Sequence, residues 1–461
     1  MLIKTKKLLT VNRIDVIFKI LHLKLKALGA EQISKKIYDE HIFYITNGLY
    51  IEEGSSKKSL KNYTDEFNSL FKSLKDNGFD SSISKIPLSC KGCISNGSHR
   101  LAASIFLKIP EVRIVETIDK QHLYNFNFFK ERGISKELLE LAILEFLHLT
   151  ENNHLAIIWP SANKKINYIN KFSEIIYEKK LILNPRAAQN FVAEVYKEHK
   201  WVGSFEDGYG GAITKVSEVF DNYSCLHLIF FKENSLKRVK QIKNLLRDKF
   251  NIGKSSVHIT DNTFETREIG NIILNNNSIH FMKYGIPNKF SSIFKNLKLF
   301  RERLNKMKID INSLIISNDT VLGIYGIKSS ETVQYLSVNK LNFHNENFHN
   351  EISNIAYYDE KVEELIYDPK NYFYFSGFKF STLDVIEKFK IKRKSPEDYI
   401  DLKLIQKLNS SKKFNIKIHL LDSIQKYKFK LIGKIIPISK KFKFYHIAKK
   451  IYKFLNSKLK F

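Results

Sequence analysis

The order of apolar and polar residues along the chain predicts strands that alternate with amphipathic helices. Two apolar runs at 225–231 and 255–260 predict strands, and residues 235–250 between them have the spacing of an amphipathic helix. Residues 313–317 predict another strand, followed by a short helix through Val321–Tyr325. This alternation is typical of an α/β fold.

The N-terminal part predicts a second, separate unit. Residues 12–28 have the spacing of an amphipathic helix. Residues 84–116 predict a strand, a hairpin-like turn at Lys91-Gly92 and a second strand. A helix from Ser98 and a last strand at Glu111–Glu116 follow. A strand that runs through a tight turn into a helix is a common place for a ligand, because the helix start carries a partial positive charge.

We therefore expect a multi-domain α/β (α+β) protein. The expected divisions are a first domain at 1–122, a largely helical connecting region at 123–200, an α/β region at 201–405 and a basic tail at 406–461. The connecting region contains one expected strand and turn, at 154–162.

Composition narrows the class of protein. A chain of 461 residues with 43% hydrophobic residues suits two or three packed domains and excludes global disorder. Three cysteines cannot build a disulfide framework, which fits a reducing cytoplasm. Cys90 and Cys93 form one C-x-x-C pair, which leaves structural zinc, a redox pair or plain thiols open. No stretch approaches the roughly 20 apolar residues of a membrane span.

The basic charge is concentrated at the C-terminus. Residues 411–461 hold 15 lysines against one acid, Asp422, within a chain whose net charge is +28. Apolar residues between Phe444 and Leu455 fall at helical spacing, which predicts a basic amphipathic helix on an anionic inner-membrane surface. Nucleic acid is the competing partner, and a solvated terminus with genome-biased codons is the plainest interpretation.

The turn before the helix at Ser98 carries the clearest chemistry. Asn96, Gly97, Ser98, His99 and Arg100 combine a flexible turn, a helix start and basic side chains, which suits a phosphate. The arrangement resembles the ParB/sulfiredoxin-like superfamily over residues 60–120. The resemblance implies a nucleotide whose phosphates are held by His99 and Arg100, with Gly97 allowing close approach and Ser98 capping the helix.

Polar residues also gather after the strand at 255–260. His258, Thr260 and Asp261 close that strand, and Glu265 opens the next helix. The carboxyl ends of strands are where α/β sheets usually hold ligands, so we expect a second site here with Asp261 or Glu265 as a catalytic base. Helix capping by Asp261 is the alternative.

Residues 314–336 resemble the nucleotidyltransferase signature, in which Gly-Ser opens a helix and an Asp-x-Asp pair follows. Ser317-Asn318 stand at the Gly-Ser position and Glu331–Gln334 at the Asp-x-Asp position, so two aligned metal carboxylates are missing. The resemblance therefore implies a degenerate, nucleotidyltransferase-like region.

Together with the two stretches just described, residues 363–405 resemble uncharacterised proteins encoded among bacterial capsule and lipopolysaccharide genes, and this resemblance covers roughly residues 150–405. The positions to watch there are Lys379, Arg393, Asp398 and Asp401, and we expect the aromatic run Tyr372–Phe375 to be core. A glycine-rich loop at 200–216 adds Lys215 as a further second-site candidate.

Together with the basic tail, these resemblances imply a nucleotide- or sugar-phosphate-binding transferase of surface-polysaccharide assembly, which we expect to be cytoplasmic and peripheral on the inner membrane. The expected ligands are ATP, CTP or a nucleotide-sugar with Mg²⁺. The alternatives are a non-catalytic scaffold of polysaccharide assembly and a ParB-like DNA-binding protein.

Overall fold

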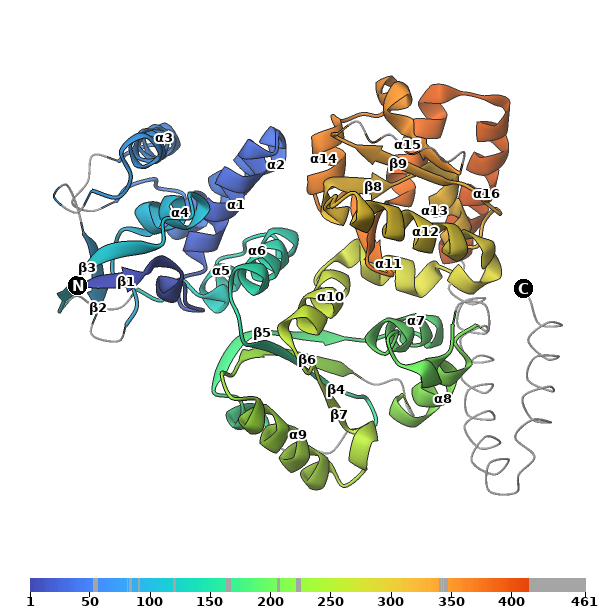
Figure 1. The fold of residues 1–461 in the computed structure, drawn as a ribbon, viewed down its shortest axis with the longest axis horizontal. Helices are drawn as coiled ribbons and strands as arrows, with labels where there is room; N and C mark the ends of the chain where they lie inside the picture. Colours follow the sequence, from blue (N-terminus) through green and yellow to red (C-terminus); the bar gives the residue numbers. More distant parts are fainter. Residues whose placement is uncertain are drawn as a thin grey trace.

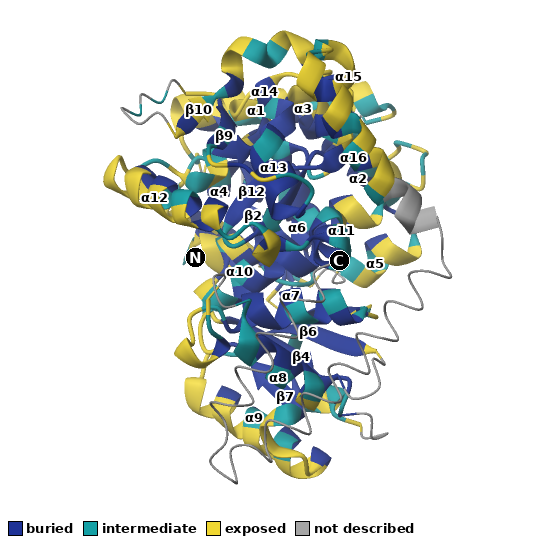
Figure 2. Cartoon of the chain, turned by 90° about the vertical axis from the view of Figure 1, so that its right-hand side faces the viewer, coloured by how far each residue is buried: buried dark blue, intermediate teal, exposed yellow. Residues whose placement is uncertain are grey.

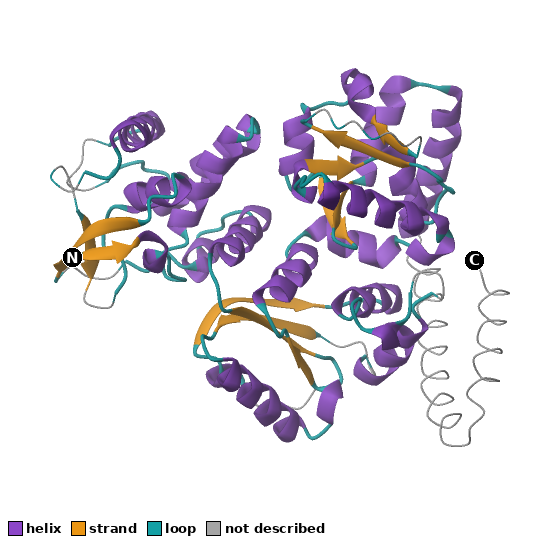
Figure 3. Cartoon of the chain, in the orientation of Figure 1, coloured by secondary structure: helices purple, strands orange, loops and turns teal. Residues whose placement is uncertain are grey.

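The computed structural model of the chain shows a mixture of helices and small sheets, as predicted (Figures 1 and 3). It describes residues 1–52, 57–80, 82, 85–89, 92–118, 122–162, 167–204, 208–220, 225–339, 341, 343 and 347–413. The predicted tail helix, Lys91 and Cys90 lie outside the described residues. Within the described part, no helix combines the length and apolarity that crossing a bilayer requires.

The first lobe is built on a three-stranded sheet in the order β1-β3-β2. β2 and β3 are parallel and are joined through α4, so the helix that begins at Ser98 is a crossover helix. The elements of this N-lobe are β1 (Leu2–Lys4), α1 (Asp15–Ala27), α2 (Glu31–Ile45), α3 (Leu60–Asn77), β2 (Ile86–Ser89), α4 (Ser98–Phe106), β3 (Glu111–Thr117) and α5 (Phe126–Glu131).

The middle lobe contains an antiparallel sheet in the order β5-β6-β4-β7. Its strands are buried on both faces: Leu228 and Phe230 of β6 face one core, and Ile229 and Phe231 face the other, which α9 covers. The elements are α6 (Lys136–Leu149), β4 (Asn153–Ile158), β5 (Glu174–Leu181), α7 (Pro185–Val195), α8 (Gly210–Val219), β6 (Leu226–Lys232), α9 (Leu236–Phe250), β7 (Val257–Ile259) and α10 (Thr263–Ile273).

The C-lobe contains a mixed sheet in the order β10-β9-β8-β12-β11. β8 is covered on both faces, because Leu314 and Ile316 enter one core and Ile315 enters another. The elements are α11 (Asn276–Tyr284), α12 (Ser292–Lys306), β8 (Leu314–Ile316), α13 (Asn318–Ile324), β9 (Val333–Ser337), β10 (Phe348–Asn350), α14 (Val362–Tyr367), β11 (Tyr372–Phe375), β12 (Phe378–Ser381), α15 (Leu383–Arg393) and α16 (Pro396–Lys413).

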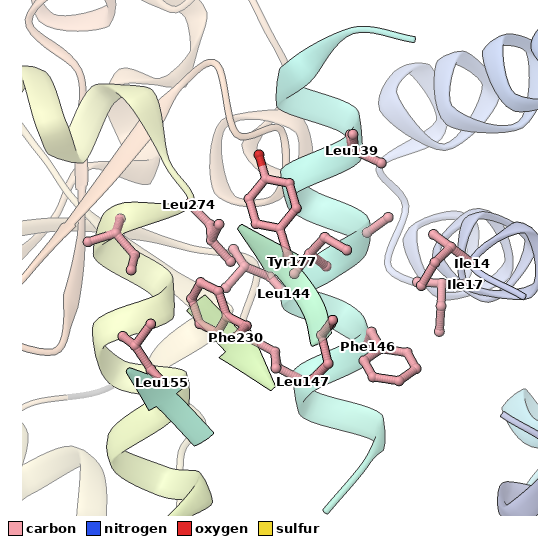
Figure 4. Packing of buried hydrophobic residues seen from close by; sticks show 14 of the residues in the cluster. Ile14, Ile17, Leu139, Leu144, Phe146, Leu147, Leu155, Tyr177, Phe230 and Leu274 are labelled. Carbon is pink, nitrogen blue, oxygen red and sulfur yellow. The ribbon is translucent and has the colours of Figure 1, made fainter. Parts of the chain in front are cut away.

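One core joins the N-lobe to the middle lobe. α6 packs on α1 and on α10, and its residues Leu144 and Leu147 lie in the same cluster as Ile17 of α1 and Phe230 of β6 (Figure 4). The burial pattern in Figure 2 shows the sheets and α6 as interior and α9 and α12 as largely exposed. Burial of this apolar surface is the main force that holds the two lobes together.

The predicted elements and the observed ones agree where the apolar pattern is clear. The predicted helix at 235–250 is α9, and the predicted strands at 225–231, 255–260 and 313–317 are β6, β7 and β8. The segment 123–200 is less helical than predicted, because it contributes both β4 and β5 to a sheet shared with β6 and β7. The short helix expected at 321–325 begins earlier, at Asn318.

Candidate functional site

The start of α4 has the form of an anion site. Gly97 occupies the N-cap in the left-handed region (φ +83°), and no side chain of the described residues caps the helix. Ser98 is the first helical residue, so the prediction that it caps the helix is wrong. The Arg100 guanidinium lies against Gly97 and donates to the Lys85 carbonyl at 2.8 Å, while the exposed Asn96 accepts the Gly97 N–H. A cation beside an uncapped helix start favours a bound phosphate.

His99 contacts the protein interior instead of the turn's open side. Its Nε2 lies 3.0 Å from the Tyr38 hydroxyl, which also lies 3.0 Å from the Tyr63 carbonyl. Because the hydroxyl donates its one proton to that carbonyl, its oxygen accepts from His99 Nε2–H. Burial lowers the pKa of His99 well below its usual value, and neighbouring lysines act in the same direction. A neutral His99 therefore holds the turn in place, and Arg100 is left as the cationic side chain of the turn.

Behind His99 lies a buried charged cluster that the sequence analysis missed. Asp15 is 1% exposed, accepts hydrogen bonds from Arg13 at 2.8 and 3.0 Å, and is 3.3 Å from Lys19 Nζ. Although burial opposes it, Arg13 and Lys19 hold the pKa of Asp15 below its usual range. The adjacent His41 is fully buried, and burial lowers its pKa well below its usual value. The sequence indicated this cluster only through two charged residues, Asp15 and Lys19, on the otherwise apolar face of α1.

The second predicted site forms a histidine–carboxylate pair. His258 Nε2 lies 2.9 Å from Glu265 Oε1, and Glu265 Oε2 accepts the backbone N–H of Asp261 at 2.7 Å. Asn262 caps α10 by accepting the N–H of Glu265. With Nε2–H donated to Glu265, His258 keeps Nδ1 as a proton acceptor, so the pair has the geometry of an oriented base.

Two other residues predicted at this site have structural roles. The side chain of Asp261 is 81% exposed and lies 3.4 Å from Lys243, so it does not join the pair. Thr260 is fully buried, with its hydroxyl 2.7 Å from that of Thr266 and accepting the N–H of Leu155 at 2.9 Å. It joins the end of β7 to β4 and α10.

The two candidate sites lie in different lobes (Figure 1). α4 packs on α1 and α3 in the N-lobe, whereas β7 and α10 belong to the middle lobe. The structure therefore brings His258 and Glu265 together but does not bring Asp261 or Glu265 to the start of α4.

In the region that resembles the nucleotidyltransferase signature, Asp319 is engaged in ion pairs, and its partner Lys390 also holds two acids of α16. Asp319 bonds to Lys328 at 2.9 Å and to Lys390 at 3.3 Å, and Lys390 also reaches Asp398 and Asp401, at 3.3 and 2.8 Å. Although burial raises it, Lys390 and Lys328 hold the pKa of Asp319 below its usual value. The cluster holds α13, α15 and α16 together.

The positions that resemble the nucleotidyltransferase motif also serve the fold. Asn318 opens α13 with a positive φ of 49°, and its amide donates to Glu351 at 3.0 Å. Glu331 is exposed, and Gln334 accepts the backbone N–H of Asp319 at 2.7 Å. Among the described residues, no three His, Cys, Asp or Glu side chains are grouped so as to hold a metal ion. The α4 start offers a cation and amides, which do not suit a resident Mg²⁺, so this ion would enter with its nucleotide.

Comparison of the chain with protein-family models, with curated proteins and with solved structures found no match. The resemblances drawn from the sequence therefore stay predictions, and the argument about function rests on the site geometry.

The two lysines predicted as second-site candidates, Lys215 and Lys379, lie in different environments. Lys215 pairs with Glu218 at 3.0 Å on α8. Lys379 is 5% exposed and donates to the carbonyls of Ile366 and Asn312, at 2.9 and 3.2 Å. Burial lowers the pKa of Lys379 to about 7. Its neighbours are the rings of Tyr367, Tyr372 and Tyr374. Tyr372 and the two phenylalanines of the aromatic run are buried, as predicted.

Proposed function

We propose that the protein is a nucleotide- or sugar-phosphate-binding transferase of bacterial surface-polysaccharide assembly. The observation that carries the proposal is the Arg100 guanidinium against Gly97 at the uncapped start of α4. Charge-assisted bonds from a guanidinium and backbone N–H groups are the usual means of holding phosphate oxygens.

The base of the transfer reaction is His258, oriented by Glu265. The acceptor hydroxyl gives its proton to Nδ1 of His258, and its oxygen forms the bond to the phosphoryl or glycosyl group. The donor's phosphate leaves with the electron pair of the broken bond, and the Glu265 carboxylate stabilises the imidazolium. Since the two sites lie in different lobes, transfer takes place at His258, and the α4 site binds a nucleotide or sugar phosphate that does not react there.

Calorimetry with ATP, CTP and nucleotide-sugars in the presence of Mg²⁺ tests the α4 site. The loss of a charge-assisted contact in Arg100→Gln is expected to weaken binding about 10- to 100-fold. Arg113→Gln, on the exposed side of β3, is the matched control and should bind as the wild type does. Absence of binding by the wild type, or unchanged binding by Arg100→Gln, would reject the site.

Release of nucleotide from an added nucleotide-sugar, which reacts at His258, tests the base. Glu265→Gln is expected to reduce turnover about 100-fold or more, since an oriented base contributes on that scale. The same variant should keep its affinity at the α4 start, because Glu265 lies in α10 of the middle lobe. Turnover at the wild-type rate in Glu265→Gln would contradict the assignment.

A non-catalytic scaffold is the second candidate, and the C-lobe favours it. Asp319, Asp398 and Asp401 are engaged by Lys328, Lys390 and Arg393 in ion pairs that hold three helices together. A scaffold would retain its partner enzymes on an affinity column while showing no turnover with any nucleotide-sugar.

We also propose a cytoplasmic location at the inner membrane through the basic tail. Vesicle sedimentation that requires anionic lipid would support this location. Binding to duplex DNA with a steep salt dependence would favour the DNA-binding alternative.

A further inference from the structure

Tyr196 lies beside His258 of the histidine–carboxylate pair, together with side chains that have no part in that pair. Tyr196 directly follows α7, and its ring centroid lies 5.2 Å from that of His258 and 5.0 Å from that of Trp201. Burial raises the pKa of Tyr196, Arg247 of α9 acts against this shift, and Glu265 adds to it. The rings of Trp201 and of His258, in β7, therefore flank Tyr196, and charges on α9 and α10 act on its hydroxyl.

Arg247 is the unexplained cation of this group. It is half-buried, and its Nε is buried without a hydrogen-bond partner among the described residues. None of the carboxylates in the described part of the chain forms an ion pair with its guanidinium. A buried donor of a charged group without a partner costs free energy, which an oxyanion in this position would recover.

Trp201 provides an exposed ring on another side of Tyr196. It is 48% exposed, and the ring of His199 lies 6.2 Å from it. Its backbone packs closely against Gly211 at the start of α8. A Cβ at position 211 would lie only 1.9 Å from the Trp201 carbonyl oxygen. A rigidly held aromatic ring with one open side is suited to stacking on a ligand ring.

We propose that this group binds a sugar that carries an oxyanion, either a phosphate or a carboxylate. The sugar ring lies on Trp201, Arg247 pairs with the oxyanion, and a hydroxyl faces His258. The assignment rests on the proposed function, since a sugar hydroxyl is what His258 would deprotonate. A free nucleobase would stack on Trp201 but has no hydroxyl for this base.

Tryptophan fluorescence can report this binding directly, because the chain contains two tryptophans with contrasting exposure. Trp159 is 1% exposed and Trp201 is 48% exposed, so acrylamide quenches Trp201 selectively. We expect glucose 1-phosphate or glucuronate to protect Trp201 from quenching, and free glucose or inorganic phosphate to protect it far less. Comparison of the two sugars identifies which oxyanion the site takes.

The variant that tests Arg247 is Arg247→Gln, with Arg238→Gln on the exposed face of the same helix as the control. Arg247→Gln should weaken protection about tenfold or more, Arg247→Lys should weaken it less, and Arg238→Gln should leave it unchanged. Protection by neither sugar, equal protection by inorganic phosphate alone, or unchanged protection in Arg247→Gln would overturn the proposal.

Binding measured in this way is independent of the transferase proposal. Arg100→Gln should retain protection of Trp201, because Arg100 lies in α4 of the N-lobe. If no nucleotide-sugar is turned over but glucose 1-phosphate still protects Trp201, the transferase proposal fails and the sugar site stands. If turnover is found without protection, the sugar site fails alone.

Discussion

The Glu364 carboxylate, in α14, accepts a hydrogen bond of 2.7 Å from the backbone N–H of Gln32, in the first turn of α2. A second bond, of 3.3 Å, comes from the N–H of Ile33. α2 has no side-chain cap of its own, so a residue more than 300 positions away in the C-lobe caps a helix of the N-lobe. Glu364 is 2% exposed, which makes this contact a fixed part of the lobe interface.

We predict that Glu364→Ala loosens this interface. Loss of an N-cap costs about 1–2 kcal/mol, and here the loss also leaves the N–H of the buried Ile33 unpaired. Urea unfolding should show the decrease, and hydrogen exchange should be faster at Gln32 and Ile33. Glu397→Ala, at an exposed position in α16, is the control; an equal decrease in that variant would mean that capping is not the cause.

For the buried ion cluster around Asp15 in the N-lobe, we predict a larger loss in the free energy of unfolding than for Glu364→Ala. Asp15→Asn leaves Arg13 and Lys19 buried without their counter-ion, and breaking such a pair costs about 3–5 kcal/mol. The pKa of Asp15 is lowered in the folded state, so its stabilisation is complete above about pH 4 and is lost as the pH falls below that value.

Urea unfolding of wild type and Asp15→Asn between pH 2.5 and 6 measures both effects. The variant should be less stable at pH 6, and its stability should fall less steeply with acid. The exposed Asp65→Asn, in α3, should resemble the wild type. If Asp15→Asn loses stability with acid as steeply as the wild type does, Asp15 is not the group that titrates.

The sequence predicted the elements whose apolar pattern is unbroken and missed those that bury charges. α9 and β6 agree with the predicted ranges to within a residue or two at each end. β5 was missed because Lys179, 4% exposed, occupies a core position as the partner of Glu140 in α6. A buried lysine breaks the hydrophobic alternation that identifies a strand, and its partner cannot be found without the fold.

The candidate sites show the same limit. His258 and Glu265 were predicted to share a site because one closes a strand and the other opens the next helix, and the fold places His258 Nε2 2.9 Å from Glu265 Oε1. Tyr196, Trp201 and Arg247 come from other segments, so no motif unites them. His99 was predicted as a phosphate ligand from its position in the turn, but only the fold shows that the Tyr38 hydroxyl of α2 lies 3.0 Å from its Nε2.

Because Lys379 is buried, we predict that the free energy of unfolding rises with pH above about 7. Its pKa is lowered to about 7 by burial, whereas an unfolded lysine has a pKa of about 10.4. Between these values the unfolded chain binds a proton that the folded chain does not, so stability rises with pH, by at most about 1.4 kcal/mol per pH unit. Below pH 7 the group is protonated in both states, and the full cost of burying its charge applies.

Unfolding of Lys379→Met between pH 7 and 9.5 checks this prediction. The slope of stability against pH should be smaller than in the wild type, because methionine fills the same space without a titrating group. Lys388→Met, at an exposed position in α15, should keep the wild-type slope. Equal slopes in wild type and Lys379→Met would show that another group titrates in this range.

Gly210 and Gly211, adjacent at the start of α8, predict opposite effects of the same substitution. A Cβ on Gly211 would lie 1.9 Å from the Trp201 carbonyl oxygen and 2.8 Å from Val202 Cα, and backbone atoms cannot yield as a flexible side chain can. Gly211→Ala should therefore displace Trp201 and cost roughly 3 kcal/mol or more. Nothing lies within 4 Å of a Cβ on Gly210, so Gly210→Ala should be neutral or stabilise α8 by about 0.5–1 kcal/mol. Thermal unfolding measures the stability of the two variants, and acrylamide quenching measures the exposure of Trp201. A larger change in quenching in Gly210→Ala than in Gly211→Ala would show that α8 does not hold the tryptophan.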